Sequence, residues 1–185
     1  MDTLEYFAIG SMMNPISLRM REISPIRSRP GVLKGYELIF VMANGYAAAR
    51  KCDTSKEEEI HGVLHTISKQ TMEQLDRIES TYVKAVEVSI KLYEEDRLSH
   101  QVNESPKETN IREQNTKRIV RGNVYILNEE IVSLNTEKFA INPPSERYID
   151  ILKEGARHFG IKVYKYGILL YTMYSSYFLM CCYHY

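Results

Sequence analysis

Short strand-like segments separated by single helices constrain the fold of this chain most. Residues 5–9, 60–67 and 83–93 each carry the apolar runs or alternation typical of β-strands. Helical patterns separate the strands one at a time, and no strand–helix–strand unit repeats along the chain. The pattern predicts an α+β fold with a compact, mixed and strongly curved β-sheet and flanking helices.

Two further strands are predicted. A long β-rich run covers residues 27–42, in which Leu38 and Phe40 share one face because strand side chains alternate. An Asn-Gly pair at residues 44–45 follows this run as a turn signal. The last strand is predicted at residues 119–127.

Each predicted helix begins at a recognisable residue. Asn14 stands before a proline and caps the first helix. Ser68 caps the second helix, which runs to about Glu79. The third helix covers residues 146–159 after a Pro-Pro-Ser sequence, and Gly160 is suited to end it.

With 185 residues, the chain is long enough for one domain with a sizeable core. We expect this domain to span residues 1–165, with the charged segment 94–117 as a loop or insertion. Residues 166–185 form an apolar and aromatic tail. A short membrane anchor and a docked tail are both open for this segment, and its short length and its Ser and Thr residues favour docking over a membrane partner.

Charge and motifs exclude several classes of function. Lys and Arg number 24, as do Asp and Glu, so charge gives no reason to expect nucleic acid as a partner. No secretory leader is visible, and the three cysteines include no Cys-x-x-Cys pair, which predicts free thiols and a cytoplasmic location. Gly-rich phosphate motifs and the Gly-x-Ser-x-Gly elbow are absent, which argues against nucleotide-dependent enzymes and serine hydrolases.

Glu79 is the residue that stands out as a candidate for chemistry. It shares the apolar face of its helix with Met72 and Leu75. A carboxyl group held on such a face has a raised pKa, which suits acid–base work. The alternative is that Glu79, at the helix end, turns out to water. We interpret Asp76 on the same side as a surface aspartate paired with a nearby base.

Two other features give weaker signals. His61 and His65 share one face of a strand, but a zinc site would need further ligands, so we predict no metal site and expect surface or half-buried histidines. Gly10 and Ser11 form a tight loop between a strand and a helix, where backbone N–H groups can face an anion. Alone, a Gly-Ser turn is not specific.

In their order, however, these segments resemble the gamma-glutamylcyclotransferase family. The opening Tyr-Phe-Ala-Ile-Gly-Ser-Met-Met at residues 6–13 is similar to the family's Tyr-Phe-Ala-Tyr-Gly-Ser-Asn-Met. The resemblance extends from residue 6 to about residue 164. Its other matching segments are 31–40, 61–65, 72–79, Tyr82, 144–148 and 154–156.

The resemblance implies a barrel-like sheet and a cofactor-free enzyme of glutathione metabolism. In the implied reaction, the α-amine of a γ-glutamyl amino acid or amine attacks its own γ-carbonyl, which releases 5-oxoproline and the free amino acid or amine. Glu79 would be the catalytic acid/base. The implied substrate-binding residues are Ile9, Gly10, Ser11, Met12, Tyr82 and Tyr148.

Two residues depart from the family motif. Ile9 stands where the family has Tyr, and Met12 where it has Asn, so the substrate loop lacks two polar side chains. An alternative therefore stays open, in which the chain is a catalytically weak or inactive relative that binds a small ligand or a protein.

Overall fold

A computed structural model of the chain describes residues 2–41, 45–52, 58–79, 83–93, 118–127 and 143–161. The predicted insertion at 94–117, the tail at 166–185 and Tyr82 lie outside these ranges. The division of the chain into one domain and a tail stays a prediction.

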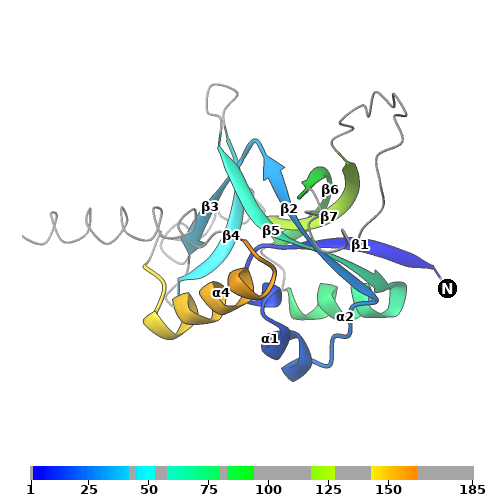
Figure 1. The fold of residues 1–185 in the computed structure, drawn as a ribbon, viewed down its shortest axis with the longest axis horizontal. Coiled ribbons are helices and arrows are strands. Elements are labelled where there is room, and N and C mark those ends of the chain that lie inside the picture. The colour runs from blue at the N-terminus through cyan, green and yellow to red at the C-terminus, as the bar shows by residue number, and fades with distance from the viewer. Residues whose placement is uncertain are drawn as a thin grey trace, which may run out of the picture.

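The described strands form one mixed sheet that closes on itself (Figure 1). They are β1 (Thr3–Ala8), β2 (Arg27–Lys34), β3 (Tyr36–Val41), β4 (Tyr46–Lys51), β5 (Glu59–Ser68), β6 (Val83–Leu92) and β7 (Ile119–Leu127). Their order is β1-β5-β2-β6-β7-β4-β3, and β1 also pairs in parallel with β7, where Tyr6 lies opposite Asn123. This pairing closes β1, β5, β2, β6 and β7 into a barrel, so the predicted α+β class with a strongly curved mixed sheet is confirmed.

The sheet departs from the sequence prediction in two places. The run predicted as one strand at 27–42 is divided at Gly35, whose φ of 76° lies in the left-handed region and separates β2 from β3. Strand β4 was not predicted, because its Tyr-Ala-Ala-Ala-Arg-Lys sequence lacks the β-branched alternation of a strand. It forms through pairing with β3, where Leu38 lies opposite Ala49.

Small residues allow the barrel interior to pack densely. A Cβ atom added to Gly62 would lie 2.7 Å from the Phe7 ring, and one added to Gly122 would lie 2.9 Å from a Leu64 methyl group. Phe7 and Leu64 are at most 1% exposed, and Phe7 pairs with Leu64 across β1 and β5. The two glycines therefore leave the volume that large apolar side chains fill.

Helices lie along one side of the barrel (Figure 1). They are the 3₁₀ turn η1 (Ser11–Met13) and the helices α1 (Pro15–Met20), α2 (Lys69–Ile78) and α4 (Glu146–His158). The Asn14 side chain accepts a hydrogen bond from the Ile16 N–H at 2.8 Å, and the Ser68 hydroxyl accepts one from the Thr71 N–H at 3.1 Å. The two helix starts predicted at these caps are confirmed. Glu79 directly follows α2.

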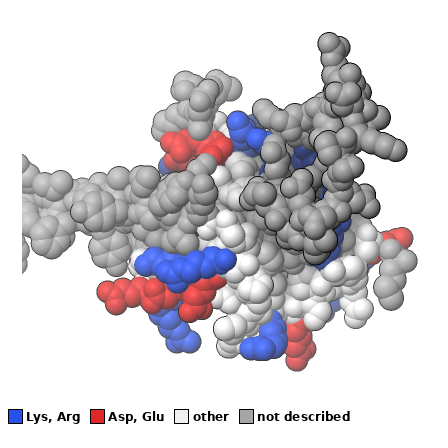
Figure 2. Space-filling model, viewed as in Figure 1, with Lys and Arg blue, Asp and Glu red and all other residues white. Residues whose placement is uncertain are grey.

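Helix α4 packs its predicted apolar stripe against the rest of the fold. Ile149, Leu152 and Ala156 are buried, and Phe159 is half-buried at the helix end. Gly160 has a φ of 65°, which confirms its predicted role as the residue that ends the helix. On the exposed side of α4, acidic and basic side chains lie side by side (Figure 2). Among the described helices, none has the length and apolar character needed to cross a membrane.

Candidate active site

The Gly10–Ser11 loop leads from β1 directly into η1. The Gly10 carbonyl accepts a hydrogen bond from the Met13 N–H, and the Ser11 carbonyl accepts one from the Asn14 N–H, each at 3.0 Å. Ile9 and Met12 beside this loop are 7% and 4% exposed and belong to the hydrophobic core. Their side chains are therefore packing groups, and a molecule bound at this loop would meet its backbone.

Helix α4 fixes the loop from the other side. The Asn14 amide group donates to the Ile151 carbonyl at 3.1 Å and to the Glu154 carboxylate at 3.3 Å. A Cβ atom added to Gly155 would lie 2.9 Å from the backbone of Met13 and of Asn14. The absence of a side chain at residue 155 lets the helix backbone approach η1 closely.

Tyr148 on α4 places its hydroxyl group against the loop. The Tyr148 oxygen accepts a hydrogen bond from the Ala47 N–H at 3.3 Å, and a Cβ atom added to Gly10 would lie 3.0 Å from it. Burial raises the pKa of Tyr148, whereas hydrogen bonds from the backbone N–H groups of Ala47 and Ser11 lower it. The structure therefore brings together Gly10, Ser11 and Tyr148, three of the residues that the sequence analysis assigned to substrate binding.

Glu79 is half-buried at the end of α2. Burial raises the pKa of its carboxyl group above the ordinary value, and the nearby Arg21 guanidinium lowers it. The charge of Glu79 in turn raises the pKa values of Tyr6, Tyr125 and Tyr148. The burial of Glu79 and the action of its charge on these hydroxyl groups favour the interpretation in which its carboxyl group faces inward over the one in which it turns out to water.

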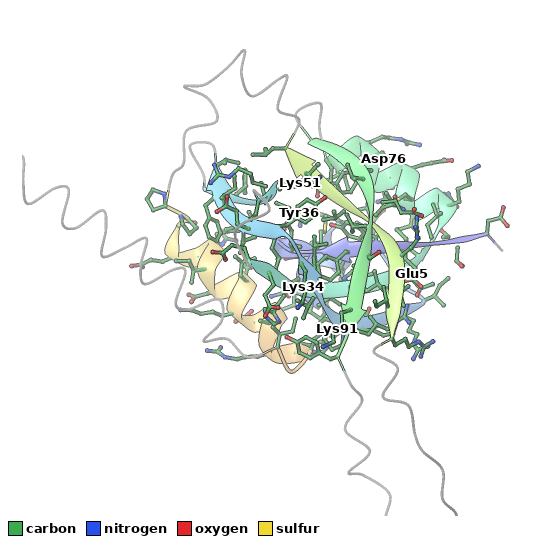
Figure 3. All side chains as sticks on the ribbon, turned by 90° about the horizontal axis from the view of Figure 1, so that it is seen from above. Glu5, Lys34, Tyr36, Lys51, Asp76 and Lys91 are labelled. Carbon is green, nitrogen blue, oxygen red and sulfur yellow. The ribbon has the colours of Figure 1, made fainter. Side chains whose placement is uncertain are left out.

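Two tyrosines complete the surroundings of Glu79. The rings of Tyr6 on β1 and Tyr125 on β7 meet edge to face, with centroids 5.8 Å apart. The Tyr125 hydroxyl donates to the Asp76 carboxylate at 2.6 Å, which places Asp76 of α2 beside the barrel (Figure 3). Asp76 is exposed as predicted, and the structure shows the Tyr125 hydroxyl as its partner; pairing of Asp76 with a base stays a prediction.

Sequence reasoning missed Arg21, Tyr6 and Tyr125 as neighbours of Glu79. Arg21 follows α1, and its carbonyl accepts a hydrogen bond from the Gln74 side chain of α2 at 2.7 Å. Because this contact joins two helices far apart in the chain, no local pattern could predict it. Tyr6 lies within the opening motif, and Tyr125 lies in a predicted strand. Alternation along a strand predicts which face a side chain takes, but not which residues of other elements lie next to it.

The predicted exposure of the two histidines is wrong. His61 is 7% exposed and His65 is fully buried. The His61 ring contacts the Tyr93 hydroxyl and, at 3.0 Å, the Glu59 carboxylate. In the part of the chain that the structure describes, no group of three or more His, Cys, Asp and Glu residues is placed to hold a metal ion.

The fold and the Glu79 site can now be compared with known proteins. Residues 6–140 match the model of the family described as "Gamma-glutamyl cyclotransferase, AIG2-like". The chain belongs to this family, which confirms the resemblance seen in its motifs. The matched segment contains the Gly10–Ser11 loop, Glu79 and Tyr125 and ends before Tyr148.

Solved structures show the same fold. A protein described as "Gamma-glutamyl cyclotransferase" has a TM-score of 0.62 at 17% identity, over 91% of this chain and 86% of that one. An uncharacterized protein from Homo sapiens has a TM-score of 0.63 at 17% identity, over 92% and 87% of the two chains. A yeast cyclotransferase described as specific to glutathione has a TM-score of 0.50 at 13% identity, over 83% and 79%. No match was found among curated protein sequences.

Proposed function

We propose that this chain is a gamma-glutamylcyclotransferase, which converts a γ-glutamyl amino acid or amine into 5-oxoproline and the free amino acid or amine. The observation that carries the proposal is Glu79, a half-buried carboxyl group whose pKa burial raises and whose charge acts on the hydroxyl groups of Tyr6, Tyr125 and Tyr148. Tyr148, one of the three, also contacts the Gly10–Ser11 loop. An acid/base and a set of backbone donors thus flank the same region, as this reaction needs.

In the proposed reaction, Glu79 moves one proton. Its carboxylate takes a proton from the substrate's α-ammonium group, and the resulting amine attacks the γ-carbonyl carbon to form a five-membered ring. Glu79 then returns the proton to the departing nitrogen as the original amide bond breaks, and the ring nitrogen releases its second proton to solvent as it becomes the lactam N–H. The raised pKa of Glu79 brings its proton affinity closer to that of both nitrogen groups, which favours transfer in each direction.

The loop supplies the substrate-binding part of the proposal. Backbone N–H groups at Ile9, Gly10 and Met12 would hold the folded glutamyl group beside Ser11, whose N–H faces the Tyr148 hydroxyl, and Tyr82 and Tyr148 would line the site. Because the Ile9 and Met12 side chains are core residues, their departure from the family motif leaves these backbone groups in place.

The assay that tests the proposal is release of 5-oxoproline. Purified protein would be incubated with a series of γ-glutamyl dipeptides and γ-glutamyl amines, and 5-oxoproline would be measured by mass spectrometry. We expect turnover, and we expect Glu79→Gln to lower kcat by about 10²–10⁴-fold because glutamine cannot carry the proton. The kcat/KM of the native chain should fall as Glu79 becomes protonated at acid pH, with a midpoint above the ordinary carboxyl pKa.

A matched control lies on the same helix. Glu73 is exposed on α2, so Glu73→Gln makes the same chemical change away from the site and should leave turnover within about twofold, as surface changes usually do. Turnover by Glu79→Gln at the native rate would refute the proposed role of Glu79. The absence of 5-oxoproline with every substrate in the series would refute the proposed activity.

The apolar residues Ile9 and Met12 favour one second candidate, a family member that binds a γ-glutamyl compound without turning it over. Calorimetry with the same substrates decides between the two. Heat of binding without 5-oxoproline formation would support the binding protein, whereas turnover would exclude it.

A further inference from the structure

His65 is a fully buried polar side chain that the proposed reaction does not use. It stands on β5 opposite Tyr6 of β1, and its ring stacks on the Tyr6 ring at a centroid distance of 6.1 Å. The Phe159 ring packs edge to face against it, with centroids 6.2 Å apart. Both ring nitrogens have polar partners, so the histidine is held in one orientation inside an otherwise apolar region.

The partners of His65 define which nitrogen carries the proton. Nε2 lies 3.1 Å from the Met12 carbonyl oxygen, which can only accept, so Nε2 carries the hydrogen and donates. Nδ1 is then unprotonated and accepts a hydrogen bond from the Ser28 hydroxyl at 2.8 Å. The Met12 carbonyl of the substrate loop thereby fixes the tautomer of His65, and the Ser28 hydroxyl of β2 donates to the nitrogen that is left unprotonated.

The contact with Met12 extends through the loop to Tyr148. The Met12 carbonyl and the Met13 N–H belong to one rigid peptide group, and that N–H donates to the Gly10 carbonyl at 3.0 Å. The Gly10 carbonyl and the Ser11 N–H belong to a second such group, which lies against the Tyr148 hydroxyl, since a Cβ atom added to Gly10 would lie 3.0 Å from it. Two peptide planes thus join the His65 ring to Tyr148.

We propose that His65 is a positioning residue, which sets the orientation of the Gly10–Met12 peptide groups, and through them the Tyr148 hydroxyl, by donating a hydrogen bond to the Met12 carbonyl. The inference rests on the proposed function in that these groups are the ones assigned to hold the glutamyl substrate. Rotation of the Met12–Met13 peptide would turn the Met13 N–H away from the Gly10 carbonyl, which releases the Gly10–Ser11 peptide in turn. His65 touches neither substrate nor reacting atoms.

Replacing His65 by glutamine or by asparagine tests whether the hydrogen bond to the Met12 carbonyl is needed or only the presence of a polar side chain. The amide nitrogen of glutamine reaches the position of Nε2, so His65→Gln keeps a donor for the Met12 carbonyl. The shorter asparagine reaches only the position of Nδ1, so His65→Asn keeps the Ser28 contact and loses the other. Both lose the ring contacts with Tyr6 and Phe159, so the comparison isolates the hydrogen bond to the loop.

We expect His65→Gln to keep kcat/KM for a γ-glutamyl dipeptide within about threefold of the native value. We expect His65→Asn to lower it by about 10- to 100-fold, the scale of a misplacement near 1 Å. Binding of 5-oxoproline, measured by calorimetry, should weaken in the same order. Equal losses in two folded variants, or no loss in either, would overturn the proposal.

An NMR measurement tests the proposal without turnover. The ¹⁵N spectrum of the native His65 ring should show a proton on Nε2 and none on Nδ1, and a spectrum with the proton on Nδ1 overturns the proposal. The amide signals of Ser11 and Met13 should stay near their native positions in His65→Gln and shift in His65→Asn. If the native chain shows these signals but forms no 5-oxoproline, the proposed function is contradicted and the positioning role stays supported. If the amide signals do not shift in His65→Asn, only the positioning role is contradicted.

Discussion

At the scale of single residues, Gly10 is constrained by a neighbouring hydroxyl group rather than by its own backbone. Its φ of −117° is open to any residue and does not by itself require glycine. The obstacle is the Tyr148 hydroxyl, 3.0 Å from where a Cβ atom would stand. Gly10→Ala would push this hydroxyl away from the loop, and we expect it to lower kcat/KM by about 10-fold or more, as loss of positioning does.

A double-mutant cycle identifies the cause of this loss. Tyr148→Phe removes the hydroxyl group and leaves the ring, so Gly10→Ala meets less crowding in that background. We expect the second substitution to cost much less activity after Tyr148→Phe than in the native chain. Equal losses in both backgrounds, with 5-oxoproline release as the readout, would show that Gly10 matters for a reason other than the Tyr148 hydroxyl.

At the scale of elements, the docking of α4 on η1 depends on Gly155. Inside a helix, alanine is favoured over glycine by about 1 kcal/mol, so propensity alone predicts that Gly155→Ala stabilises α4. The structure predicts the opposite, because the new methyl group would stand 2.9 Å from the backbone of Met13 and Asn14. We expect the free energy of unfolding to fall by about 1–3 kcal/mol, the cost of overpacking, as measured by urea denaturation.

Arg157 offers the control for this prediction, because it is an exposed position on the same helix. The variant Arg157→Ala should unfold within about 0.5 kcal/mol of the native chain. A stability gain in Gly155→Ala would mean that propensity outweighs the contact with η1. Activity gives a second readout, since a displaced α4 also moves Tyr148.

The elements were predictable from sequence wherever local chemistry determines them. Asn14 and Ser68 cap helices through bonds to residues two or three positions away, and Gly160 ends a helix by its own conformation. Strand β4 was not predictable, because its alanines gain stability only from pairing with β3. The surroundings of Glu79 were half predictable: its helical face is a local property, whereas Arg21 reaches it through packing of α1 on α2.

At the scale of the whole molecule, burial of His65 couples folding stability to pH. Burial lowers the pKa of His65 from an ordinary 6.5 to about 4. The groups packed around it are the Ser28 hydroxyl, the Met12 carbonyl and the rings of Tyr6 and Phe159, none of which carries a charge that would favour the protonated ring. Between pH 6.5 and pH 4, the unfolded chain therefore binds a proton at this residue that the folded chain does not.

The sign of the effect follows from proton linkage. Because the folded pKa is lowered, the stability from neutral His65 is complete above pH 6.5 and is lost as the pH falls towards 4, by up to about 3 kcal/mol. Glu79 acts in the opposite direction, since its raised pKa means that the folded chain binds a proton first. Urea denaturation of native protein and of His65→Gln across this range separates the two groups, because only the native chain contains the titrating histidine. We expect the native chain to lose stability relative to His65→Gln as the pH falls, and a constant difference between them would show that His65 binds its proton equally well in both states.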